Sequence, residues 1–181
     1  MNAVCVYCGS SFGANGLYLQ ATQTLARTLV ARGLRVVYGG ASVGLMGALA
    51  NTAIEAGGEV VGVIPQTLVE REIAHQGLTE LHVVGSMHER KALMAELSDA
   101  FVALPGGIGT LEELIEVYTW SHLRLHDKPL GLLNVAGYYD GLNAFLDHAV
   151  TEGFLPNGQR AKLVTASEPE ALLDALASAR G

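Results

Sequence analysis

The sequence predicts an α/β protein in which a doubly wound, mostly parallel sheet lies between two layers of helices. Short, continuous apolar runs alternate along the chain with longer segments of helical periodicity. Such runs are typical of strands that are covered on both faces, and right-handed crossovers between them give a three-layer sheet. We expect residues 1–181 to form a single domain, because the length suits one domain and no linker or repeat interrupts the pattern.

Each expected strand is an apolar run that ends at a turn signal. AVCVY opens the series, LRVVY runs into two glycines, EVVGVI ends at Pro65, and AFVAL ends at Pro105. The sixth strand follows Pro129, and a short seventh lies near the end of the chain. In order, the strands are Ala3–Tyr7, Leu34–Tyr38, Glu59–Ile64, Leu81–Val84, Ala100–Leu104, Leu130–Asn134 and Leu163–Thr165.

The expected helices fill the intervals between these strands. Gly33 is placed to end the first helix and Gly57-Gly58 the second. Residues 66–79 are polar and give no clear assignment. The helices are Leu17–Arg32, Leu45–Ala56, Met87–Leu97, Leu111–Leu123, Tyr138–Glu152 and Glu170–Ala179.

Composition and charge exclude several classes of protein. Half of the residues are hydrophobic and 16% are charged, so the chain can bury a core and is not disordered. The net charge of −7 and the lack of a basic run argue against binding nucleic acid. No apolar run reaches the roughly 18 residues of a membrane span. With two cysteines and no secretory pattern at the start, we expect a cytoplasmic protein.

Glycine is concentrated where a ligand would bind. Ligands of open α/β sheets bind outside the carboxyl ends of the strands. Ten of the 22 glycines follow three expected strands there: Gly9, Gly13 and Gly16; Gly39, Gly40, Gly44 and Gly47; Gly106, Gly107 and Gly109.

The sharpest of these turns is PGGIGT, residues 105–110, which leaves a buried strand and enters a helix. Glycines let the backbone approach an anion, and the free N–H groups of a helix start point toward it. The alternative is a tight turn in which Thr110 caps the helix. The Lys-Ser/Thr pair of a P-loop is absent, so the motif does not indicate nucleoside triphosphates.

Glu113 has two interpretations. Thr110-Leu111-Glu112-Glu113 fits a capping box, in which Glu113 only closes the helix start. Alternatively, the carboxylate stands beside the anion loop and serves a cationic transition state or a water molecule.

A second segment carries a basic pair. Ser86 to Glu89 also fits a capping box, which makes Glu89 structural. Arg90 and Lys91 follow early in the helix, where the helix dipole disfavours cations. Either a nearby anion or carboxylate compensates for them, or they are solvated at the surface.

Other polar residues indicate no metal site. Cys5 and Cys8 are spaced C-x-x-C, but no second pair exists, and on a strand they face opposite sides. We therefore expect buried or loop thiols. His122 and His126 lack a third ligand. Glu72 and His75 belong either to a solvated loop or to a pocket wall.

Two linked motifs carry a resemblance to a known family. Residues 105–113 fit PGGxGTxxE, and Ser86-Met87-His88-Glu89-Arg90-Lys91 fits its partner motif. The sequence resembles the LOG ("Lonely Guy") family of cytokinin-activating phosphoribohydrolases, which are often labelled lysine decarboxylases, from Val4 to about His148. Where the family commonly has a third glycine after Tyr38-Gly39-Gly40, this chain has Ala41.

The resemblance implies a Rossmann-like fold, a homodimer and hydrolysis of the N-glycosidic bond of an adenosine 5′-monophosphate, N6-prenylated or plain, without metal or cofactor. It implies that Arg90 and Glu113 are catalytic. The expected substrate-binding residues are Glu72, Met87, Lys91, Gly106, Gly107, Ile108, Gly109, Thr110, Leu111, Glu112, Thr119, Gly9, Ser10 and Gly40.

Rival functions are weaker. A non-catalytic nucleotide or molybdenum-cofactor carrier of the same fold would need anion donors but no carboxylate at the ribose. Binding of single-stranded DNA is disfavoured by the charge. A lysine decarboxylase would carry pyridoxal phosphate on a lysine, yet the chain has only Lys91, Lys128 and Lys162, and Lys91 belongs to the nucleotide motif.

Overall fold

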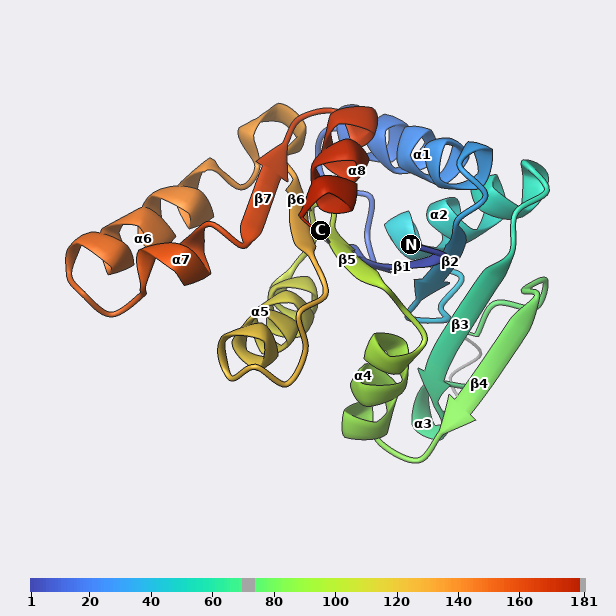
Figure 1. Cartoon of the computed structure of the whole chain (residues 1–181). Helices are drawn as coiled ribbons and strands as arrows, with labels where there is room; N and C mark the ends of the chain where they lie inside the picture. Colours follow the sequence, from blue (N-terminus) through green and yellow to red (C-terminus); the bar gives the residue numbers. More distant parts are fainter. Residues whose placement is uncertain (70–73, 180–181) are drawn as a thin grey trace.

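A computed structural model describes residues 1–69 and 74–179 and contains a seven-stranded sheet (Figure 1). Every neighbouring pair of strands is parallel, so the expected α/β class is confirmed, with the sheet wholly parallel. The strand order is β4-β3-β2-β1-β5-β6-β7. The bounds are β1 Ala3–Tyr7, β2 Arg35–Tyr38, β3 Val60–Pro65, β4 Glu80–Val84, β5 Ala100–Ala103, β6 Leu130–Leu133 and β7 Leu163–Ala166.

Helices cover both faces of the sheet and complete the three layers (Figure 1). One face is covered by α1 (Gly16–Ala31), α2 (Gly44–Glu55) and α8 (Pro169–Ser178), and the other by α4 (Met87–Glu96) and α5 (Ile108–His122). The shorter or more peripheral helices are α3 (Gln66–Val69), η1 (Val135–Gly137), α6 (Asp140–Thr151) and α7 (Asn157–Arg160).

The strand order reverses at β1, which creates the topological switch point of the sheet. After β1 the chain enters α1 on one face, and after the neighbouring β5 it enters α5 on the other. Tyr7 pairs with Ala103, so the two strands end at the same level. The Gly9 N–H then donates to the carbonyl of Pro105 at 3.2 Å, which joins the two glycine turns.

Several boundaries differ from the sequence prediction. Helix α5 begins at Ile108 rather than Leu111, because Gly107 serves as its N-cap and Gly109 continues the helix. The expected helix Tyr138–Glu152 begins only at Asp140, because Tyr139, its N-cap, has a non-helical ψ of 7°. The two edge strands, β4 and β7, are partly exposed, unlike the strands between them.

The described residues of the polar segment 66–79 include one short helix. This helix is the single turn α3, and Ala74 forms an isolated antiparallel bridge with Ala41. The expected site residue Glu72 lies outside the described residues. Within the described ranges, no helix is long and apolar enough to cross a membrane, and no group of three acidic, His or Cys side chains is placed to hold a metal ion.

Candidate active site

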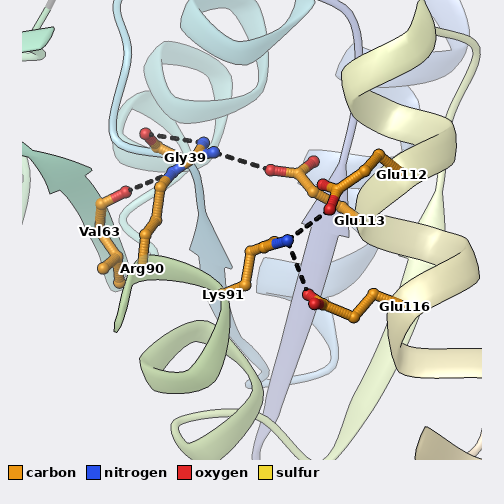
Figure 2. Close-up of polar contacts among 7 residues, drawn as sticks. All are labelled: Gly39, Val63, Arg90, Lys91, Glu112, Glu113 and Glu116. Carbon is orange, nitrogen blue, oxygen red and sulfur yellow. Dashed lines mark hydrogen bonds and ion pairs between the residues drawn. The ribbon is translucent and has the colours of Figure 1, made fainter. Parts of the chain in front are cut away.

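A buried ion pair joins the two sequence motifs. Arg90 on α4 donates from Nη1 to Oε1 of Glu113 on α5 at 2.8 Å (Figure 2), and both side chains are about 10% exposed or less. Arg90 also donates from Nε to the Val63 carbonyl at 3.0 Å and from Nη2 to the Gly39 carbonyl at 3.2 Å. These bonds fix the guanidinium plane and use three of its five N–H groups within the described chain, which leaves two for a ligand.

The Glu113 carboxylate is buried, and Arg90 binds one of its two oxygens. Burial raises its pKa above the ordinary value, and the facing Arg90 guanidinium partly opposes that rise. Among the described residues only Oε1 has a hydrogen-bond partner, so Oε2 is available. The charge of Arg90 is therefore neutralised by the Glu113 carboxylate. Arg90 is not a solvated surface residue, since it is buried.

The capping-box interpretation of Glu113 is wrong. The N-cap of α5 is Gly107, which has no side chain to cap the helix, and Thr110 lies inside the first turn. The amide N–H groups of that turn have no intrahelical acceptor and point outward with the favourable end of the helix dipole. Glu113 lies one turn after Thr110 on the same helix face. The structure thus places an uncapped helix start and a buried carboxylate within the first two turns of the same helix.

The glycine turn packs too closely for side chains at one of its two central positions. A Cβ at Gly106 would lie 2.1 Å from Thr110 Oγ1 and 2.9 Å from the Gly9 nitrogen. A Cβ at Gly107 would meet no protein atom within 4 Å. Gly106 is therefore required by the fold, whereas the space at Gly107 is open to a ligand.

Lys91, the neighbour of Arg90, pairs with carboxylates of α5 other than Glu113. Its amine pairs with the carboxylates of Glu112 and, at 3.0 Å, Glu116 (Figure 2), while its own side chain is 6% exposed. The described structure therefore neutralises Lys91 within the protein, on the neighbouring flank of α5. The capping box at Ser86 is present, since the Glu89 N–H donates to Ser86 Oγ at 3.1 Å.

The remaining expected substrate-binding residues lie on α4, on α5 and in the turns after β1 and β2. Met87 and Ile108 are exposed at the starts of α4 and α5, and Leu111 is half-buried on α5. Ser10 follows Gly9 in the turn after β1, and the Gly40 carbonyl accepts from the His75 N–H at 2.9 Å.

Thr119 lies about 18 Å from Gly107 along α5, so the fold does not bring it to the turn. Its hydroxyl donates to the Ile115 carbonyl at 2.7 Å.

The cysteines and His126 are internal. Both thiols are free and buried, and burial raises the pKa of Cys5 to about 12. His126 Nε2 contacts the Val117 carbonyl at 2.8 Å, and its Nδ1 accepts from the Lys128 N–H. Burial lowers the pKa of this histidine, which favours the neutral ring. Lys128 itself donates to the Ala95 carbonyl at 2.7 Å.

Sequence reasoning missed three residues that shape the site. Gly39 and Val63 supply the carbonyls that orient Arg90, and a Cβ at Gly39 would lie 1.9 Å from Arg90 Nη2. Gly39 belongs to the glycine cluster after the second strand, so the sequence did contain a pattern that could have indicated it as a site residue. Tyr138 donates from its hydroxyl to the Gly106 carbonyl, and nothing in the sequence pattern indicates that contact.

With a wholly parallel sheet whose strand order reverses at β1 and with helices on both faces, the molecule is a Rossmann-like α/β protein. A family model described as possible lysine decarboxylase matches residues 46–176, and the chain belongs to this family. Relatives place it with the LOG proteins. A cytokinin riboside 5′-monophosphate phosphoribohydrolase of Rhodococcoides fascians is 51% identical over 97% of this chain and 89% of that protein. One from Arabidopsis thaliana is 52% identical over 96% of this chain and 76% of that protein.

Solved structures with low sequence identity share the fold. A molybdenum cofactor binding protein from Rippkaea orientalis has a TM-score of 0.74 at 22% identity, covering 99% of this chain and 98% of that one. DNA processing protein A of Helicobacter pylori has a TM-score of 0.58 at 18% identity, covering 98% of this chain and 80% of that one. The same architecture thus serves proteins that differ in what they bind.

Proposed function

We propose that this protein is an N-glycosyl hydrolase that cleaves a cytokinin riboside 5′-monophosphate, or AMP, to free base and ribose 5-phosphate. The observation that carries the proposal is the buried Arg90–Glu113 pair beside the uncapped start of α5. The names of the relatives support the same reaction. A carrier of the same fold needs the helix start but has no use for the carboxylate.

The 5′-phosphate would bind at the glycine turn. The N–H groups of Ile108, Gly109 and Thr110 begin α5 without a side-chain cap, and a phosphate there accepts their hydrogen bonds. The open space at Gly107 admits the phosphate oxygens. The ribose then extends from the turn toward Glu113.

Cleavage places positive charge on the ribose. The bond from C1′ to the base nitrogen breaks, its electron pair leaves with the base, and the sugar passes through an oxocarbenium-like state. The Glu113 carboxylate stabilises this cation and takes a proton from the water whose oxygen bonds to C1′. The departing base gains one proton, so the elements of water are divided between ribose 5-phosphate and the free base. Arg90 holds the carboxylate in place and offers its two unused N–H groups to the substrate.

The proposed assembly is a homodimer formed through the α4–α5 side. Exposed apolar side chains gather at the end of α5, where Leu123 and Leu125 are 60% and 69% exposed. Next to them, α4 and the α5 end line a mostly apolar pocket of about 370 Å³ that includes Trp120 and Phe101. Burying such a surface against a second copy would remove it from water.

The two free, buried cysteines fit a reducing compartment, and we propose the cytoplasm.

A panel of nucleoside 5′-monophosphates tests the activity. The purified protein is incubated with prenylated AMP, AMP, GMP and CMP, and free base is measured by chromatography. Release of adenine or prenyladenine with ribose 5-phosphate is the expected result. Tight nucleotide binding without release of any base would instead show a carrier.

A further inference from the structure

We propose that Tyr138 is a positioning residue that sets the affinity for the substrate phosphate by locking one peptide of the anion loop. This proposal rests on the proposed phosphate site. The peptide is the one between Gly106 and Gly107. The Tyr138 hydroxyl donates to its carbonyl oxygen, on Gly106.

A trans peptide is planar, and its C=O and N–H point in opposite directions. A hydrogen bond that pulls the Gly106 carbonyl toward Tyr138 therefore aims the Gly107 N–H away from Tyr138. In the described part of the chain, that N–H has no acceptor. It joins the N–H groups of the first turn of α5 as a donor for an anion.

This peptide needs an external lock because glycine stands on both sides of it. Glycine populates backbone conformations that other residues avoid, so the 106–107 peptide is the one in the turn that flips most easily. The neighbouring carbonyls are already held. Leu104 accepts from the Tyr139 hydroxyl at 2.6 Å, and Pro105 accepts from the Gly9 N–H at 3.2 Å.

The Tyr138 ring is itself fixed in place. It packs edge-to-face against Tyr18, with centroids 5.6 Å apart, and against Tyr139 at 5.0 Å. The turn before it is tied by Asn134, whose side chain donates to Asp140 and accepts from the Tyr139 N–H, both at 2.7 Å. The left-handed Ala136 and Gly137 form this turn.

The ring also borders a pocket beside the glycine turn. Tyr138 is 41% exposed and lines a pocket of about 210 Å³ together with Phe12, Gly106 and Gly107. The hydroxyl lies against the glycine turn, residues 105–110, and donates to the Gly106 carbonyl. That hydrogen bond fixes the direction of the Gly107 N–H.

Tyr138→Phe tests the proposal, because it keeps the ring and removes only the hydroxyl. Inhibition constants are measured for inorganic phosphate and for adenosine, which lacks the 5′-phosphate, together with KM and kcat for the nucleotide. We expect the phosphate inhibition constant and KM to rise about 5- to 10-fold. The adenosine inhibition constant and kcat should stay within about twofold, since the hydroxyl touches neither the base nor the carboxylate.

Tyr18→Phe is the matched control, because its hydroxyl has no hydrogen-bond partner among the described residues while its ring packs in the same cluster. Unchanged phosphate affinity in Tyr138→Phe, or an equal loss for phosphate and adenosine, would overturn the proposal. Titration calorimetry with AMP repeats the comparison without turnover. A wild-type protein that binds AMP but releases no base would contradict the proposed hydrolysis while leaving this test intact.

Discussion

Arg90 and Glu113 lie 23 positions apart on different helices, yet their side chains meet at 2.8 Å in the protein interior. The guanidinium is anchored by two carbonyls, that of Gly39 just after β2 and that of Val63 within β3. A buried pair with this support is costly to break and retains its geometry when a ligand arrives. It gives the carboxylate a fixed position, which the proposed reaction requires.

Glu113→Gln should abolish most base release while preserving the fold. The amide still accepts from Arg90, so packing is kept, but it no longer stabilises a cationic sugar. We expect kcat to fall by at least about 100-fold, measured as free base from AMP or prenylated AMP. The melting temperature should fall as well, because the buried Arg90 loses its counter-charge, so kcat is compared at a temperature at which the variant is folded. Glu55→Gln, an exposed change on α2, is the control. Full activity in purified Glu113→Gln would exclude the mechanism.

Activity should depend on pH, because the reaction requires the Glu113 carboxylate in its ionised form. Because burial raises the pKa of Glu113, activity should fall on acidification at a higher pH than an ordinary glutamate pKa of about 4.3. Glu112 raises the same pKa by like charge, so Glu112→Gln should move the acid limb of kcat/KM to lower pH. A limb that stays in place or moves to higher pH would contradict this assignment.

Alanine at the two central glycines should separate folding from binding. Gly106→Ala drives a Cβ into Thr110 and the Gly9 backbone, so the melting temperature and activity should both fall. Gly107→Ala meets no protein atom, so stability should be retained while KM for the nucleotide rises. Thermal denaturation and steady-state kinetics on both variants make the comparison. Wild-type KM in Gly107→Ala would place the phosphate elsewhere.

Lys91→Met should destabilise the protein. It leaves Glu112 and Glu116 without the cation that lies between them. Because both carboxylates remain partly exposed, at 50% and 24%, we expect the free energy of unfolding in denaturant to fall by about 1 kcal/mol, the value of a solvent-accessible ion pair. Exposed Lys162→Met is the control. Equal stability of the two variants would show that the contact contributes nothing to folding.

The proposed dimer should depend on the end of α5. Leu125→Glu places a charge on the exposed apolar surface and should shift the protein to monomers in analytical ultracentrifugation. Phe145→Glu makes a similar change at an exposed aromatic on α6 and should leave the mass unchanged. A monomeric wild type, or a dimer that tolerates Leu125→Glu, would argue against this interface.

The sequence alone determined the α/β class, the parallel sheet and the glycine turns at one edge of it. Period and burial are local properties, so continuous apolar runs and helix stops such as Gly33 place most elements within a few residues. The two linked motifs, at 86–91 and 105–113, also pointed to Arg90 and Glu113 together. Their roles in the reaction follow from the family resemblance rather than from the spacing.

Only the tertiary structure decided which alternative held at each polar residue. Glu113 fits a capping box as well as a site, and the choice depended on where Arg90 lies across two helices. Lys91 proved to be paired internally, and Thr119 lies far from the turn. The contact of Tyr138 with Gly106 spans 32 positions and depends on a left-handed turn. Such contacts arise from how elements pack, and no local pattern encodes them.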